Sequence, residues 1–320
     1  MSASEKPVSQ SNGISEYPDV DVCIPVRNRA KVLPRVLDAL YNLDYPKNKI
    51  RLIFVDDEST DETPNILKNF YERHHSEYKE ILIERVKHLG FNIPRVRNLA
   101  FRHTKSSLIF WLDSDVLPPS DALKILVADL REDDSVVLSC IPYAYREEDL
   151  WKSSLPIDID LSLGCTLIRR DLLEKIGGFD ERYTRTDDLW LQQMIKKLGF
   201  KIKIHRDKRC LHLHTIKYHE VIASKFVHQS RSLFLLLIDG LWDRSLYRRY
   251  AYYSAILFSL MFLPLCPALG LIFVLLLIIG VIWHKSVNRY IHVAPIGLVI
   301  TLGIFLTFLN PLAWRLARKR

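Results

Sequence analysis

Three short groups of polar residues could bind a phosphate-bearing ligand, because each directly follows an apolar stretch of the chain. They are Arg27 with Asn28, Asp56 with Asp57, and Asp113 with Asp115. Two carboxylates one residue apart supply the hard oxygen ligands that suit Mg²⁺ or Mn²⁺, and such an ion can neutralise the charge of a diphosphate. An acidic turn after a strand is by itself more often a solvated loop, so its meaning depends on the elements around it.

The apolar stretches alternate with segments of helical spacing. Strands are expected at 19–26, 50–55, 81–86, 107–112 and 135–140, and helices at 31–40, 62–71, 94–103 and 119–130. This alternation predicts an α/β fold with a mainly parallel sheet that helices cover on both faces. Ligands of such sheets bind beyond the carboxyl ends of the strands, where all three polar groups fall. The glycine signatures of dinucleotide-binding and P-loop proteins do not occur in the sequence.

Five motifs follow one another in a fixed order along the chain. They are VCIPVRNR, IFVDDESTDET, GFNIPRVRNLAF, IFWLDSDVLPP and GGFDERYTRTDDLWLQQMIKKLGF. In their order and spacing, over residues 19–215, the chain resembles the inverting glycosyltransferases of family 2. The resemblance implies a GT-A fold, which is Rossmann-like, and a nucleotide-diphosphate sugar as the donor substrate. It also implies a divalent metal, Mn²⁺ or Mg²⁺, as the cofactor.

The resemblance implies roles for the residues at the strand ends. The positions that match the nucleotide pocket are Pro25, Arg27, Asn28, Asp56, Asp57, Arg97 and Asp113. Among these, Asp57 matches a carboxylate that accepts a hydrogen bond from the nucleobase, and Arg97 is expected to reach the diphosphate. Asp113 and Asp115 match the two ends of the DxD motif, so Asp113 is expected near the ribose and the metal, and Asp115 on the metal.

A second pair of carboxylates, Asp187 and Asp188, matches the acceptor side of the family. Direct displacement at the sugar requires a group that takes the proton of the acceptor hydroxyl, and we expect Asp188 to be this general base. The alternative is that the pair caps the start of a helix. If the acceptor is a phosphate, it is already ionised. Asp188 would then orient it, and Arg182 and Arg185 would contact it.

His212 and His214 are expected to complete the metal site. They alternate in the segment CLHLHT, so both would lie on the same face of a strand. Some GT-A enzymes add a histidine of this kind to the metal ligands, although an isolated His-x-His pair is more often structural.

The last quarter of the chain is strongly apolar. No charged residue occurs from 250 to 284, which is 35 positions, or from 290 to 314, which is 25. Both runs exceed the roughly 20 apolar residues that cross a bilayer, so we expect an α-helical membrane domain over 250–320. Pro264 and Pro267 leave open a re-entrant hairpin, or one crossing by 269–283 with 250–262 tilted near the interface. Buried helices of a soluble protein are a further possibility. Flanking arginines favour two crossings, and residues 219–249 are expected to form interfacial helices.

The charge of the chain supports the same division. The formal net charge is +8, and nine basic residues with no acidic residue lie between 244 and 320. The excess therefore belongs to the apolar segment, which indicates anionic membrane lipids as partners and excludes nucleic acid. Five scattered cysteines indicate a reducing compartment, and residues 1–18 read as a disordered lead without a signal peptide.

The sequence thus predicts a GT-A domain over 19–218 on the cytoplasmic side of the cell membrane or an ER-type membrane. The expected reaction is a metal-dependent, inverting, single transfer to a lipid-linked or polyprenyl-phosphate acceptor. A processive polysaccharide synthase is disfavoured, because QSRSL at 229–233 lacks the tryptophan of the QxxRW element. The pattern also leaves open a nucleotidyltransferase or a degenerate nucleotide-sugar-binding membrane protein.

Overall fold

A computed structural model gives the structure of the chain. It describes residues 17–150, 161–205, 207–213, 229–262 and 269–284, together with 298, 300–302, 304, 306, 307 and 309. The chain divides into two compact units. One comprises Met1–Phe179 and Leu198–His214, and the other comprises Asp180–Lys197 and Thr215–Arg320.

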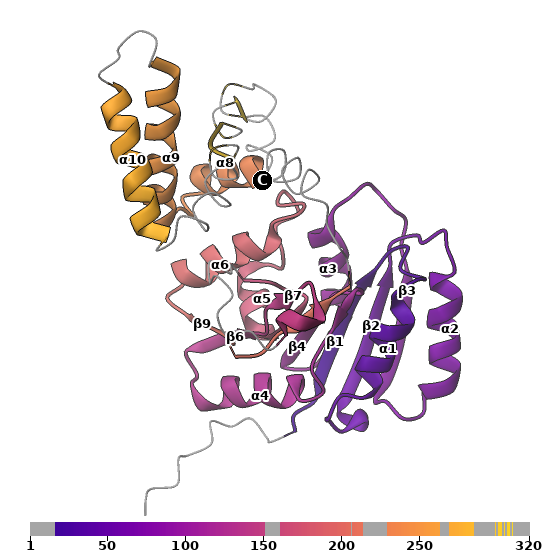
Figure 1. The fold of residues 1–320 in the computed structure, drawn as a ribbon. Helices are drawn as coiled ribbons and strands as arrows, with labels where there is room; N and C mark the ends of the chain where they lie inside the picture. The colour runs from indigo at the N-terminus through magenta and orange to yellow at the C-terminus, as the bar shows by residue number, and fades with distance from the viewer. Residues whose placement is uncertain are drawn as a thin grey trace, which may run out of the picture. The chain divides into compact units, whose positions relative to one another are not determined.

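The first unit is built on a seven-stranded sheet with the strand order β3-β2-β1-β4-β8-β6-β9 (Figure 1). Its strands are β1 Val20–Val26, β2 Ile50–Asp56, β3 Glu80–Arg85, β4 Leu108–Leu112, β6 Val136–Cys140, β8 Cys165–Arg169 and β9 Lys201–Ile204. Six strands run in one direction, and β8 runs antiparallel to both of its neighbours, β4 and β6. The expected α/β fold with a mainly parallel sheet is confirmed.

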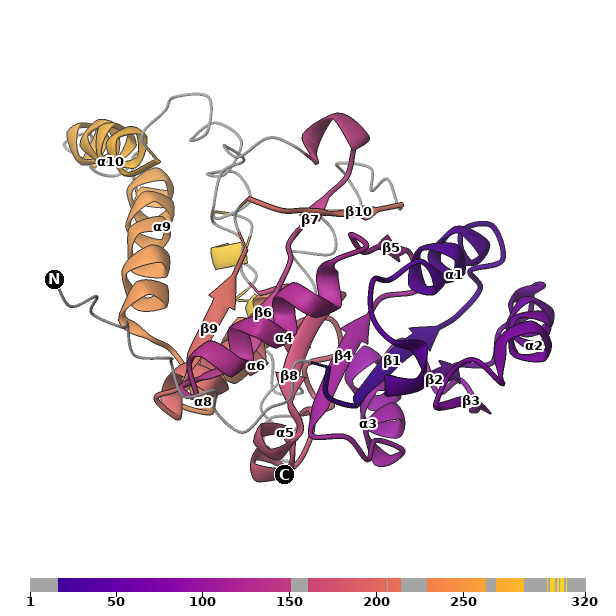
Figure 2. The same cartoon turned by 90° about the horizontal axis from the view of Figure 1, so that it is seen from below.

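Helices cover both faces of this sheet. They are α1 Leu33–Tyr41, α2 Thr63–His74, α3 Ile93–Arg102, α4 Ala122–Glu132 and α5 Arg170–Ile176, with short 3₁₀ turns η1 Lys47–Lys49 and η2 Glu147–Asp149. Figure 2 shows α1 and α4 on one side of the sheet and α3 and α5 on the other. Helices α1, α2 and α3 each have a proline in the first turn, where a missing N–H costs no hydrogen bond.

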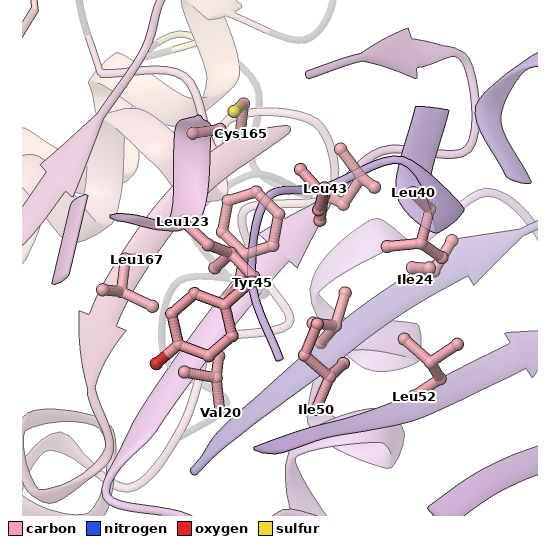
Figure 3. Close-up of a cluster of buried hydrophobic side chains, with 14 of the residues drawn as sticks. Val20, Ile24, Leu40, Leu43, Tyr45, Ile50, Leu52, Leu123, Cys165 and Leu167 are labelled. Atoms are coloured by element: carbon pink, nitrogen blue, oxygen red, sulfur yellow. The ribbon is translucent and has the colours of Figure 1, made fainter. Parts of the chain in front are cut away.

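A hydrophobic core lies between the sheet and the helices α1, α2 and α4. Because strand side chains alternate, Val20 and Ile24 of β1 point into this core together with Ile50 and Leu52 of β2 (Figure 3). The intervening Asp21 is fully buried on the other face. It accepts hydrogen bonds from Ser106 N and Ser106 Oγ at 2.7 and 2.8 Å, so its charge is compensated.

A small second sheet lies in the same unit, with the order β5-β10-β7. Its strands are β5 Val116–Leu117, β10 Cys210–His212 and β7 Tyr143–Ala144. The β10–β5 pairing sets His212 opposite Val116, directly after Asp115.

The four cysteines in the described part of the chain are free and buried. Burial raises the pKa of Cys140 to about 12, so this thiol stays protonated and unreactive at neutral pH.

The second unit is helical in its described residues. It contains α6 Asp187–Lys197, α8 Ser230–Ile238, α9 Arg244–Phe262 and α10 Leu269–His284. Helices α9 and α10 pack on each other, and Tyr252 Oη donates a hydrogen bond to the Leu276 carbonyl at 2.8 Å (Figure 1).

The expectation of transmembrane helices over 250–320 is corrected by these elements. Within the described residues, none of the helices combines the length and the apolar character that crossing a membrane requires. Helix α10 is apolar but comprises 16 described residues, and α9 begins with the charged segment RSLYRR. Most of the run from 290 to 314 lies outside the described residues.

Candidate active site

The carboxyl ends of β1 and β2 lie side by side and carry the first two polar groups. Val26 pairs with Asp56 in the parallel register, and Asp57 N donates to the Val26 carbonyl at 2.9 Å. The loops that follow the two strands therefore leave the sheet together. Pro25 is part of β1, opposite Val55, so it supports the loop from within the strand.

Asn28 fastens these two loops to each other. Its backbone has a φ of 50°, a left-handed conformation that asparagine tolerates better than most residues. Asn28 N donates to Ser59 Oγ at 2.9 Å, and Asn28 Oδ1 accepts from Thr60 N at 2.8 Å. Arg29 N donates to Thr63 Oγ1 at 2.8 Å. These hydrogen bonds hold the loop after β1 against the loop after β2.

Asp56 and Asp57 occupy different surroundings. Asp56 Oδ1 accepts a hydrogen bond from Ser59 N at 3.0 Å, so this carboxylate holds the turn after β2. Asp57 Oδ2 lies 2.5 Å from His88 Nδ1, and the other nitrogen of His88 contacts Arg27 Nη1. Asp57 Oδ1 is buried, and no hydrogen bond reaches it from the described part of the chain. Asp57 Oδ1 thus keeps an unused capacity to accept a hydrogen bond, with Arg95 Nη1 as an ion-pair partner 3.6 Å away.

Asp113 is held between residues of two other elements. Arg97 Nη2 of α3 lies 2.9 Å from Asp113 Oδ1, and Tyr143 Oη of β7 donates to Asp113 Oδ2 at 2.9 Å. The guanidinium of Arg97 also lies over the rings of Trp111 and Phe179, at 5.7 and 6.0 Å from their centroids. The structure pairs Arg97 with Asp113, and its expected contact with a diphosphate stays a prediction.

Gly164 provides the space in which Tyr143 meets Asp113. Its carbonyl accepts from Asp113 N at 3.1 Å, across the start of β8. A Cβ at position 164 would lie 2.6 Å from Asp113 Cγ and even closer to Asp113 Oδ2 and Tyr143 Oη. Burial, followed by the neighbouring Asp113, raises the pKa of Tyr143 well above its usual value, so its hydroxyl remains a donor at neutral pH.

Asp115 faces a cation on one side and a histidine on the other. Its Oδ2 lies 3.1 Å from Arg29 Nη2, and its Oδ1 lies 3.7 Å from His212 Nε2. The rings of Tyr143 and Tyr145 pack against His212, with centroids 5.0 and 5.2 Å away. The structure therefore brings together the expected metal ligands Asp115 and His212. His214 lies outside the described residues.

The donor set fits a metal that also takes ligands from a substrate. Across the described ranges, no group of three or more His, Cys, Asp and Glu side chains could hold an ion. Mg²⁺ sites of phosphate-transferring enzymes commonly use one or two carboxylates and complete the shell with substrate phosphates and water. Asp115 with His212 suits such a site. Asp113, whose two oxygens contact Arg97 and Tyr143, stays a predicted metal ligand.

The GGFD segment leaves the first unit in a fixed conformation. Gly177 and Gly178 have φ values of +78° and +83°, which glycine adopts without strain. The amide of Asn98 on α3 then bonds both backbone groups of Phe179. Its Nδ2 donates to the Phe179 carbonyl at 2.9 Å, and its Oδ1 accepts from Phe179 N at 2.8 Å.

The second unit holds Asp187 and Asp188 in the first turn of α6, where carboxylates favour the positive end of the helix. Asp188 Oδ1 accepts from Leu189 N at 2.7 Å, and Asp187 is buried. These contacts accord with the capping alternative, and the role of Asp188 as a base stays a prediction. Arg182 forms ion pairs of 2.6 Å with both Asp180 and Asp239.

Three residues of the site were missed in the sequence. His88 lies in the loop after β3, Tyr143 follows β6, and Gly164 precedes β8. Gly164 stands at the start of an apolar segment, CTLI, which is the one local signal of a strand entering the site. His88 and Tyr143 carry no such signal, because their importance comes from partners 31 and 30 positions away.

Comparison with known families places these motifs in context. The model of "Glycosyl transferase family 2" matches residues 21–187. The chain is 26% identical over 212 residues to a probable glycosyltransferase, YdaM, of Bacillus subtilis, covering 59% of this chain and 49% of that protein. It is 24% identical to the beta-monoglucosyldiacylglycerol synthase of a Nostoc species, covering 74% of this chain and 50% of that protein. The chain thus spans about half the length of these relatives.

Solved structures show a similar fold. The mannosyltransferase PcManGT of Pyrobaculum calidifontis, in complex with GDP-Man and Mn²⁺, has a TM-score of 0.69 at 21% identity. The match covers 95% of this chain and 91% of that one. TarS of Staphylococcus aureus with UDP has a TM-score of 0.51 at 19% identity, covering 65% and 63% of the two chains. At these identities the likeness establishes the GT-A-like fold alone.

Proposed function

Because this chain belongs to glycosyl transferase family 2, we propose that it transfers a sugar from a nucleotide-diphosphate donor to an acceptor with the aid of a divalent metal. The observation that carries the proposal is the meeting of Asp115 with His212 at the same sheet edge as Asp57. Asp115 and His212 suit a metal ion, and Asp57 Oδ1 has the unused capacity to accept a hydrogen bond from a base.

In this proposal the residues at the sheet edge bind different parts of the donor. Asp57 binds the nucleobase through Oδ1, and Asn28 keeps the adjoining loops closed around it. Asp115 and His212 hold Mn²⁺ or Mg²⁺, which offsets the charge of the leaving diphosphate when bound. Asp113 is oriented by Arg97 and Tyr143 toward the ribose.

The proposed chemistry is a single displacement with inversion at the sugar. Asp188 takes the proton of the acceptor hydroxyl as that oxygen attacks, and Asp187 steadies the first turn of α6. If the acceptor is a phosphate, Asp188 orients it instead. The names of two similar proteins, one bound to GDP-Man with Mn²⁺ and one to UDP, support a nucleoside-diphosphate donor.

A lipid-linked or polyprenyl-phosphate acceptor is the part of the proposal that concerns the second unit. The name of the Nostoc relative, a beta-monoglucosyldiacylglycerol synthase, supports a lipid acceptor. Helix α10 exposes a purely apolar stripe that includes Leu275, Ile278 and Ile282, and the start of α9 exposes Arg244 and Arg248. An apolar face beside basic residues favours an anionic membrane surface, and we place the enzyme at the cytoplasmic side of the cell membrane.

Asp115→Asn tests the metal and donor site directly. Titration calorimetry with GDP and with UDP, each with and without Mn²⁺, should show that the variant loses the Mn²⁺-dependent part of the affinity. Asp44→Asn is the matched control, because Asp44 is an exposed carboxylate paired with Lys124. Unchanged Mn²⁺-dependent affinity in Asp115→Asn, with the control also unchanged, would refute the site. Transfer from GDP- and UDP-sugars to polyprenyl phosphate, followed by mass spectrometry, tests the acceptor.

A further inference from the structure

His88 joins two residues of the nucleotide site that come from different strands. The residue lies in the loop between β3 and α3, and its ring is mostly buried, with 20% of the side chain exposed. Its Nδ1 is 2.5 Å from Asp57 Oδ2, and its Nε2 contacts Arg27 Nη1. Its backbone N–H donates to Glu58 Oε2 at 3.0 Å, which holds the loop against the turn after β2.

The partners of the ring determine which nitrogen carries the proton. A guanidinium can only donate hydrogen bonds, so His88 Nε2 must accept from Arg27. The hydrogen of the neutral ring then lies on Nδ1 and is donated to Asp57 Oδ2. The hydrogen bond from Arg27 fixes the orientation of the histidine ring, and the ring in turn fixes the orientation of the Asp57 carboxylate.

This arrangement leaves the two oxygens of Asp57 in different states. Oδ2 is occupied by His88, while Oδ1 is buried and accepts no hydrogen bond from the described residues. Arg95 Nη1 lies 3.6 Å from Oδ1, beyond hydrogen-bonding distance. If His88 did not hold Oδ2, the carboxylate could turn and pair fully with Arg95, and the acceptor for the base would be lost.

We propose that His88 is a positioning residue that fixes the Asp57 carboxylate so that Oδ1 can accept a hydrogen bond from the donor nucleobase. This inference rests on the proposed nucleotide-sugar function. It assigns His88 to the binding of the donor and not to the transfer step, so its loss changes the donor KM and leaves kcat at saturating donor unchanged.

Two nearly isosteric substitutions separate the two hydrogen bonds of the ring. In His88→Asn the amide nitrogen lies close to the place of Nδ1 and can still donate to Asp57 Oδ2. In His88→Gln the amide lies close to the place of Nε2, so contact with Arg27 is kept and donation to Asp57 is lost. Both substitutions remove the imidazole, so a merely structural role would make their effects similar.

The measurements are the dissociation constants of GDP and UDP with Mn²⁺ by calorimetry, and the donor KM and kcat in transfer. We expect His88→Gln to weaken binding of the preferred nucleotide roughly 10-fold, as one hydrogen bond to a charged acceptor would. We expect His88→Asn to stay within about 3-fold of the parent protein. Equal effects of the two variants, or a fall in kcat with an unchanged KM, would overturn the inference.

Asp57→Asn distinguishes failure of this inference from failure of the proposed function. If Asp57→Asn leaves nucleotide affinity unchanged, the nucleobase site itself is wrong. If Asp57→Asn weakens binding and His88→Gln does not, only the role of His88 is wrong. In the double variant, His88→Gln should add no further loss, because the histidine acts through Asp57. An additive loss in the double variant would contradict this path. Thermal unfolding of every variant identifies any that fail to fold. If His88→Gln fails to fold, the nucleotide affinity of His88→Asn relative to the parent protein tests the inference.

Discussion

Replacing Gly164 by alanine should disrupt the contact of Tyr143 with Asp113 while leaving both of those residues in the sequence. The backbone of Gly164 does not have a positive φ, so alanine meets no backbone strain there. The new Cβ, however, would stand 2.6 Å from Asp113 Cγ and closer still to Asp113 Oδ2 and Tyr143 Oη, whereas real Cβ atoms keep at least 3.0 Å. Both side chains must therefore retreat, and the hydrogen bond of 2.9 Å between them breaks.

The expected loss of stability follows from three contributions. Overpacking costs about 1–3 kcal/mol, and the lost hydrogen bond to a carboxylate costs about 1.5–3 kcal/mol. Alanine lowers the conformational entropy of the unfolded chain, which stabilises the folded protein by about 0.4–1 kcal/mol. Gly164→Ala should therefore lower the free energy of unfolding by about 1.5–5.5 kcal/mol, and nucleotide binding with Mn²⁺ should weaken because Asp113 moves.

Urea unfolding and calorimetry measure these two effects. Tyr143→Phe in the Gly164→Ala background removes the hydroxyl that clashes and should restore about 1 kcal/mol. Gly199→Ala is the control, since φ at Gly199 is +78° with open space around it. It should cost about 1–2 kcal/mol through backbone strain and leave nucleotide binding unchanged. If Gly164→Ala were as stable as the parent protein and bound nucleotide equally well, the packing argument would be refuted.

Three further predictions concern other elements. Asp188→Asn should lower transfer by roughly 10²- to 10⁴-fold with unchanged nucleotide affinity, and a parental rate would leave Asp188 as a helix cap. Asn98→Ala should lower the free energy of unfolding in urea by about 1–3 kcal/mol, because it removes both hydrogen bonds to the Phe179 backbone; a change below about 0.5 kcal/mol would contradict this. Although burial opposes it, hydrogen bonds from His205, Lys203 and Ser139 lower the pKa of Asp129. The stabilisation that Asp129 contributes is therefore present above the unfolded pKa of about 3.9 and is lost as pH falls through the lower folded value. The difference in the free energy of unfolding in urea between the parent protein and Asp129→Asn should be large at pH 7 and shrink below about pH 4. A difference that stays constant with pH would be inconsistent with that assignment.

The first half of the sheet could be predicted from the sequence because its signals are local. The runs at 50–55 and 107–112 are apolar, bounded by polar residues, and became β2 and β4 within one residue at each end. Strand β8 was not predicted, since its reversed direction depends on pairing with β4 and β6 and not on its own residues. The short strands β5 and β7 have two residues each, too few for any periodicity to be visible.

The candidate site divides in the same way. Asp57 and Asp115 could be found because each follows an apolar run, where a parallel sheet places its ligands. His212 was expected beside Asp115 from the motif that carries it, whereas the contact of His88 with Asp57 could not be found, since it forms only in the folded sheet. The expected role of Arg97 at a diphosphate illustrates the difference. A cation in a matching motif was recognised, but its engagement with Asp113 depends on the packing of α3.

The two parts of the site also become available at different times during protein synthesis. Asp57 and His88 both emerge early, in the loops after β2 and β3, and these two strands pair with each other and with β1. The contact of Asp115 with His212 forms only after β10 has been synthesised, and the same strand is the partner of β7, which carries Tyr143. That strand follows Asp115 by roughly 100 residues, which at about 5–20 residues per second is a delay of about 5–20 s on the ribosome. A nascent chain that stalls in this interval contains Asp57, His88 and Asp115 but lacks the strand that carries His212.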